Sequence, residues 1–140
     1  MVGCEVEDLC KKLKQDIKKV NIDTDSIFKY VQILILPKNP NDSQTGNEKY
    51  LIVRGFKDCH EHSDVFQKFY RQELMVNETL NNKYYTMLQG GGRIDHDSVN
   101  KKISIYGYSN SFGVANHQLT QTILKEAYPN YEVKWSNEGY

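Results

Sequence analysis

The chain has 140 residues, in which 18 lysines and arginines are balanced by 18 aspartates and glutamates. That length suits one domain with a substantial core. A formal net charge of zero gives no overall field that would attract nucleic acid or an anionic membrane, so any anion site must be local. No apolar run is long enough to cross a membrane, and the first residues lack the pattern of a secretory signal. Three cysteines without paired spacing indicate reduced thiols. We therefore expect a cytoplasmic monomer without membrane or nucleic-acid partners.

The first third of the chain predicts one helix and two strands. An amphipathic helix is indicated by apolar residues at alternating steps of four and three: Val6, Cys10, Leu13, Ile17 and Val20. We interpret residues 1–19 as an N-terminal helical extension of a domain formed by residues 20–140. A turn over 21–26 leads to residues 27–36, a β-branched and aromatic run that predicts a strand, and 49–55 predicts a second strand.

Residues 59–64, Cys-His-Glu-His-Ser-Asp, precede a segment with the apolar spacing of a helix face, carried by Val65, Phe66, Phe69, Tyr70 and Leu74. Ser63 is a plausible N-cap, and Asp64 suits the first turn. His62 would then stand at the helix N-terminus, where unpaired N–H groups and the dipole favour an anion and a neutral imidazole. This geometry indicates phosphate chemistry with His62 as base or nucleophile. The simpler alternative is an ordinary surface histidine.

The second half continues with alternating elements. A polar stretch over 77–83 precedes a short strand over 84–88, and Gly90–Gly92 then suits a tight bend beside a ligand. The remaining predicted elements are a strand from residue 102, a helix over about 116–128 that stops at Pro129, and a strand over 131–135. Interleaved strands and helices predict an α/β or α+β layer fold with a mixed sheet of five or six strands.

The sequence lacks the motifs that other classes of phosphatase require. Asp23 and Asp25 resemble an aspartyl nucleophile pair, but they precede a strand where such a pair would follow one, and turn caps explain them. A cysteine phosphatase needs Cys-x5-Arg, and the residue six positions after Cys59 is Val65. Cys59 and the nearby histidines do not have a usual zinc-site spacing, so we expect no metal and no other cofactor.

Several segments in order resemble the 14 kDa phosphohistidine phosphatase (janus) family. They are Val20–Val31, Ile52–Gly55, His62–Phe66, Gly90–His96, Lys101–Ser109, Phe112–Gly113 and Tyr128–Tyr140. The resemblance covers about residues 20–140. It implies a mixed six-stranded sheet between helices and a metal-independent enzyme that hydrolyses the P–N bond of phosphohistidine on proteins, with other phosphoramidates as further substrates.

The resemblance also implies roles for individual residues. His62 matches the catalytic histidine, as general base or covalent nucleophile, and the phosphate-binding positions fall on Lys29, Arg54, Ser63, Arg93, Ser109 and Ser111. Two departures stand out. Glu61 occupies a position that is aromatic in the family pattern, and Asn110 and Ser111 are more polar than that pattern. Histidine-phosphorylated proteins and the phosphate anion are the expected partners, and the alternative is a non-catalytic protein that binds phosphorylated partners.

Overall fold

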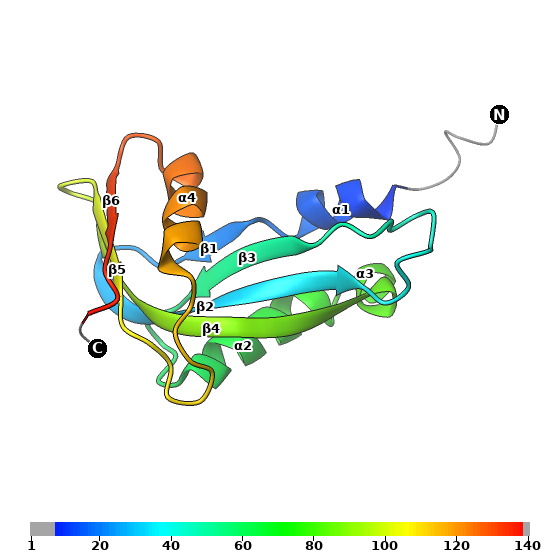
Figure 1. Cartoon of the computed structure of the whole chain (residues 1–140), viewed down its shortest axis with the longest axis horizontal. Coiled ribbons are helices and arrows are strands. Elements are labelled where there is room, and N and C mark those ends of the chain that lie inside the picture. Colours follow the sequence, from blue (N-terminus) through cyan, green and yellow to red (C-terminus); the bar gives the residue numbers. More distant parts are fainter. Residues whose placement is uncertain (1–7, 139–140) are drawn as a thin grey trace.

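The computed structural model describes residues 8–138. A mixed six-stranded sheet with strand order β1-β3-β2-β4-β5-β6 forms its centre (Figure 1). The strands are β1 (Val20–Ile22), β2 (Ser26–Pro37), β3 (Tyr50–Gly55), β4 (Tyr84–Asp97), β5 (Lys102–Tyr106) and β6 (Glu132–Trp135). The outer pairs β1–β3 and β5–β6 are parallel, and the inner pairs are antiparallel. This confirms the predicted mixed α+β layer fold.

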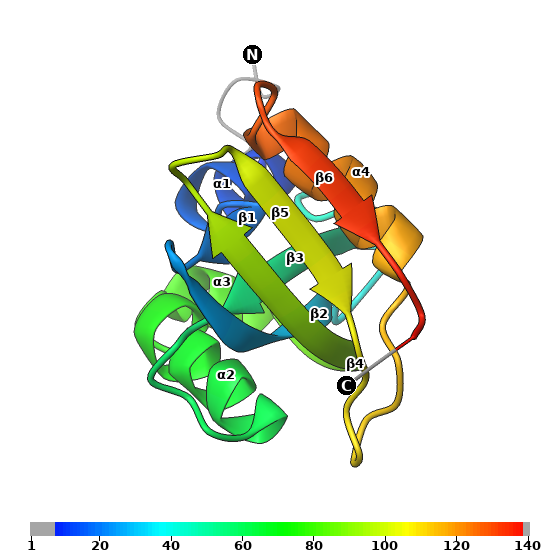
Figure 2. The same cartoon turned by 90° about the vertical axis from the view of Figure 1, so that its left-hand side faces the viewer.

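Helices cover both faces of the sheet. They are α1 (Leu9–Asp16), α2 (His62–Phe69), a π-helical turn η1 (Tyr70–Leu74), α3 (Glu78–Lys83) and α4 (His117–Ala127). Figure 2 shows α2 and α3 on one side of the sheet and α4 on the other. Strand alternation follows this division, because β2 buries Val31, Ile33 and Ile35 under α2 and its neighbours while Phe28 and Tyr30 face the α4 side.

The N-terminal helix belongs to the same core as the rest of the domain. Leu9, Leu13 and Ile17 are at most 1% exposed and pack in the cluster formed with β2, β3 and α2. The helix ends at Asp16, before Val20 of the predicted apolar face, which begins β1, and Val6 lies outside the described residues. No helix among residues 8–138 is long and apolar enough to span a membrane.

Three segments differ from the sequence-based expectation. Strand β1 overlaps the start of the predicted turn over 21–26, and helix α3 lies in the polar stretch over 77–83. The glycine triplet does not form the predicted tight bend: Gly90–Gly92 lie inside the long strand β4, next to a register shift between Gln32 and Ile33 of β2. Both short elements are held by neighbours, β1 by pairing with β3 and α3 by the Asn77 side chain, which accepts a hydrogen bond from Leu80 N–H.

Candidate active site

The start of helix α2 carries the predicted catalytic histidine. His62 is the first helical residue and Ser63 the second, so the backbone N–H groups of both lack acceptors within the helix. The predicted cap at Ser63 is wrong, because the N-cap is Glu61, whose N–H donates to Asp64 Oδ2 at 3.0 Å. Asp64 thus lies in the first turn as expected, and its carboxylate fixes the entry of the chain into the helix.

The His62 ring is buried against the glycine triplet of β4. Its Nε2 lies 2.9 Å from the carbonyl oxygen of Gly92, and the residue is 4% exposed. A methyl group on Gly91 would lie 2.4 Å from His62 Cδ2 and 2.9 Å from Nε2. The triplet therefore gives the close backbone approach that the sequence suggested, but it receives a histidine ring within a strand instead of forming a bend.

The hydrogen bond to Gly92 determines the tautomer of His62. A carbonyl oxygen only accepts, so Nε2 carries the proton and Nδ1 keeps its lone pair. Burial lowers the pKa of His62, and the positive charges of Lys29 and Arg93 lower it further, against opposing contributions from the Gly92 carbonyl and Glu61. His62 is therefore a neutral imidazole near pH 7, with its basic nitrogen available for chemistry.

The loop that follows β5 forms the second wall of the site. Ser109 and Gly113 exchange two backbone hydrogen bonds of 3.0 and 2.8 Å, and Ser109 Oγ accepts from Phe112 N–H at 3.1 Å. The N–H groups of Asn110 and Ser111 have no hydrogen-bond partner among the described residues. Gly91 holds this loop in place, donating to Gly113 O at 3.1 Å and accepting from Ala115 N–H at 3.0 Å.

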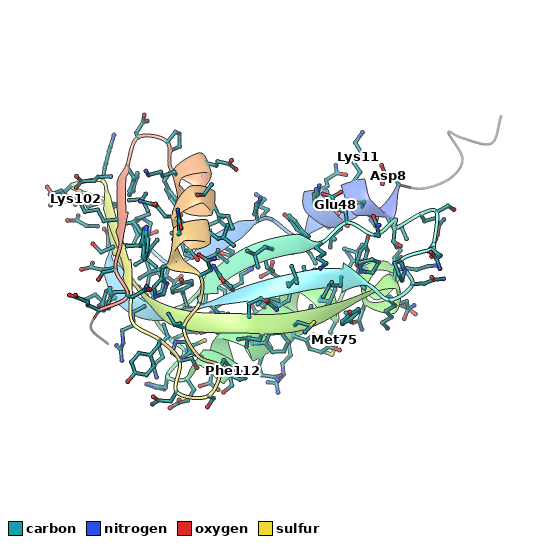
Figure 3. All side chains as sticks on the ribbon, in the orientation of Figure 1. Asp8, Lys11, Glu48, Met75, Lys102 and Phe112 are labelled. Carbon is teal, nitrogen blue, oxygen red and sulfur yellow. The ribbon has the colours of Figure 1, made fainter. Side chains whose placement is uncertain are left out.

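The helix start and the loop enclose a small polar pocket of about 70 Å³, lined by Lys29, Glu61, His62, Ser63, Ser109, Asn110, Ser111 and Phe112. Figure 3 labels Phe112 on this loop. The pocket is far below the size of a drug-like ligand site and suits one small anion. Larger hollows of about 500 and 490 Å³ elsewhere contain no histidine. A third, of about 320 Å³, contains His96, but the carboxylates of Asp25, Asp95 and Asp97 line it and would repel phosphate. We therefore place the candidate site at the smaller pocket.

Two cations act on this pocket from neighbouring strands. Lys29 of β2 lines it and lies opposite Arg93 of β4 in the strand pairing, which puts both residues on the α2 side of the sheet. Arg93 is half-buried, is not among the lining residues, and contributes through its charge, which lowers the pKa of His62. Lys29 and Arg93 thus add positive charge around the pocket, and phosphate binding by either residue stays a prediction.

Arg54 does not reach the pocket. Its guanidinium is fully buried and donates to both carboxylate oxygens of Glu73 at 2.8 and 2.7 Å, and to the carbonyls of Lys18 and Val53. It also lies over the ring of Phe69. These partners occupy the guanidinium, so the predicted phosphate contact is corrected to a structural role that ties η1 to the sheet and to the segment before β1.

Two other histidines, His117 and His96, contribute to the scaffold, whereas His60 is exposed. His117 is 1% exposed, its Nε2–H donates to Gly107 O at 2.8 Å, and its Nδ1 accepts from the Tyr30 hydroxyl at 2.6 Å. It therefore fixes the beginning of the pocket loop from the α4 side. His96 is also buried, 2.8 Å from Asp23 O. Among residues 8–138, no three His, Cys, Asp or Glu side chains gather in a way that could hold a metal ion.

Sequence reasoning missed how the pocket is supported. The Gly92 carbonyl that sets the His62 tautomer has no side-chain signature, and the Tyr30–His117 bond joins residues 87 positions apart. The one available signal was the glycine triplet itself, since three successive glycines in a β-rich region point to a close backbone approach.

Together the sheet and the site define a small α+β domain in which a neutral histidine at a helix start lines an anion-sized pocket beside Lys29. The profile of the Janus/Ocnus family matches residues 14–132. The chain is 38% identical over 124 residues to the 14 kDa phosphohistidine phosphatases of Sus scrofa and Homo sapiens, which covers 89% of this chain and 93% and 94% of those proteins. It is 37% identical over 121 residues to the sex-regulated protein janus-A of Drosophila melanogaster, covering 86% of this chain and 80% of that protein. The chain belongs to the Janus/Ocnus family.

Proposed function

We propose that this protein is a protein phosphohistidine phosphatase that hydrolyses the P–N bond of phosphorylated histidine. The observation that carries the proposal is the neutral His62, which has an unprotonated Nδ1 and lines a phosphate-sized pocket between a helix N-terminus and a loop with free N–H groups. The phosphohistidine phosphatases of pig and human among its relatives support the same chemistry.

The pocket supplies what such a reaction requires. Backbone N–H groups of His62, Ser63, Asn110 and Ser111 bind the equatorial phosphoryl oxygens, and Lys29 adds a positive charge. The phosphate is thereby held in line with the attacking group, which accounts for much of the rate in phosphoryl transfer. Protonation of the departing imidazole makes it a good leaving group, so strong covalent activation is unnecessary.

Nδ1 of His62 can act in either of two ways during hydrolysis of the P–N bond. As a general base it takes a proton from the attacking water while a P–O bond forms and the P–N bond breaks, and it returns that proton to the leaving nitrogen. As a nucleophile it forms its own P–N bond while the substrate P–N bond breaks and the leaving imidazole takes a proton from solvent, and water later hydrolyses the phosphorylated His62 to release phosphate. A single-turnover reaction stopped early separates these routes, because only the second leaves phosphate on the peptide that contains His62.

The test of function is phosphate release from a histidine-phosphorylated protein in the presence of a metal chelator. We expect turnover by the wild type and none by His62→Ala, with circular dichroism confirming that the variant is folded, and His62→Gln as a second variant of closer size. Equal turnover by wild type and variants would place the chemistry elsewhere. Loss of wild-type activity in chelator, reversed by zinc, would contradict the metal-independent reaction that we propose. Phosphate binding without turnover would indicate a binding protein instead.

A further inference from the structure

The rim of the candidate pocket carries a carboxylate. Glu61 lines the pocket beside His62, and its Oε2 lies 3.8 Å from Lys29 Nζ. The Glu61 side chain is 71% exposed, whereas that of Lys29 is 17% exposed. The hydrogen bond from Glu61 N–H to Asp64 Oδ2 fixes the backbone of Glu61, so its carboxylate changes position only through the side-chain rotamers.

An anion that enters this pocket has to compete with the Glu61 carboxylate for the ammonium group of Lys29. Lys29 is the only ion-pair partner of Glu61 among the described residues, and phosphate needs the same ammonium group. When phosphate takes Lys29, the Glu61 carboxylate loses its partner and remains within a few ångströms of a second negative group. Like charges at this distance repel, although solvent weakens the repulsion at an exposed rim.

A positive charge on the substrate removes this conflict. A lysine or arginine close to the phosphorylated side chain can pair with the released Glu61, so that two ion pairs replace the original one. Free phosphate and substrates with acidic flanks cannot make this exchange. The same carboxylate therefore penalises one group of ligands and favours another, which is how a single charge produces specificity.

We propose that Glu61 is a specificity-determining residue that directs the pocket towards phosphorylated segments with a lysine or arginine beside the phosphorylated residue. This inference rests on the proposed function and deepens it. It concerns the choice among substrates and leaves the role of His62 unchanged.

The experiment compares phosphohistidine peptides that are identical except for lysine or glutamine at the positions flanking the phosphorylated histidine. For the wild type we expect kcat/KM to be about two- to fivefold higher with lysine flanks, the range of one solvent-exposed ion pair. Glu61→Gln should abolish this preference, strengthen product inhibition by inorganic phosphate, and keep the backbone bond to Asp64. The preference should also disappear in about 1 M salt, where the screening length is about 3 Å.

Glu126→Gln, the same change at an exposed position of α4 outside the pocket, is the matched control and should behave as the wild type.

A preference that survives Glu61→Gln, or one that Glu126→Gln removes equally, would overturn the proposal. An equal change of kcat with both peptides, with their ratio unaltered, would also overturn it, because Glu61 would then act only through His62. The same peptides are titrated calorimetrically against His62→Ala. If no peptide is hydrolysed yet lysine flanks still strengthen binding in a manner that depends on Glu61, the proposed enzyme fails and the specificity stands. Binding without any charge preference refutes the specificity alone.

Discussion

Replacing Gly91 by alanine tests the catalytic geometry without changing any ionisable group. The added methyl would lie 2.4 Å from His62 Cδ2 and 2.9 Å from the carbonyl oxygen of Tyr30. Carbon atoms in contact prefer about 3.5–4.0 Å, so the imidazole ring has to retreat by more than about 1 Å, because the strand backbone is paired on both sides. That shift breaks the bond from Nε2 to Gly92 O. A displacement of about 1 Å at a reacting group lowers the rate about 100-fold, and overpacking reduces the free energy of unfolding by about 1–3 kcal/mol.

Steady-state phosphate release and urea unfolding of Gly91→Ala measure the two effects separately. The matched control is Gly46→Ala, since a methyl there meets nothing within 4 Å, although Gly46 has φ of +63°. We expect the control to lose about 1 kcal/mol from left-handed strain and to keep its full kcat. If folded Gly91→Ala retains wild-type kcat, then His62 does not react from the position described, and the assignment of Nδ1 fails.

Three further outcomes follow from the structure. Burial lowers the pKa of His62 below its ordinary 6.5, so the neutral form persists into mildly acidic solution, and kcat/KM measured from pH 5 to 8 should fall only below pH 6.5. Below pH 6.5 the free energy of unfolding should also fall, because the unfolded chain binds the proton more readily than the folded one. Arg54→Met should lower the free energy of unfolding by about 3 kcal/mol, because it leaves Glu73 without its partner. KM in the folded enzyme should stay unchanged, and a raised KM would show that Arg54 does bind phosphate. His117→Ala should cost about 2 kcal/mol in urea unfolding and raise KM more than it lowers kcat, since the bond to Gly107 positions the pocket loop; an unaltered KM would contradict that role.

The sequence predicted the elements whose signal is local. Strand β2 follows from its run rich in β-branched and aromatic residues, and helix α4 from its apolar spacing and the proline after it. The elements that were missed have weak local signals and strong tertiary partners. Strand β1 has three residues and exists because β3 pairs with it, and no pattern in three residues identifies such a strand.

The candidate site was predictable in its residue types more than in its geometry. A histidine before an amphipathic segment with a carboxylate two positions later indicates a helix start, and the structure places His62 there. Arg54 illustrates the limit of this reasoning. Strand alternation puts its side chain on the same face as α2, but only the fold shows that Glu73, 19 positions away, takes the guanidinium before any phosphate could.

The site is held by the centre of the sheet, although most of the pocket wall comes from the helix start and the loop. Gly92 shows how. Its carbonyl accepts from His62 on the α2 side, and a methyl on its Cα would lie 2.6 Å from His117 Cε1 on the α4 side. Gly91 in turn receives the His62 ring and binds the pocket loop through both of its backbone groups. The helix start and the loop are therefore both attached to the same two residues of β4, Gly91 and Gly92. This common attachment limits changes in the distance between them. Preorganised N–H groups are effective because they do not have to move as charge develops on the phosphoryl oxygens, and a support shared through two glycines provides that condition.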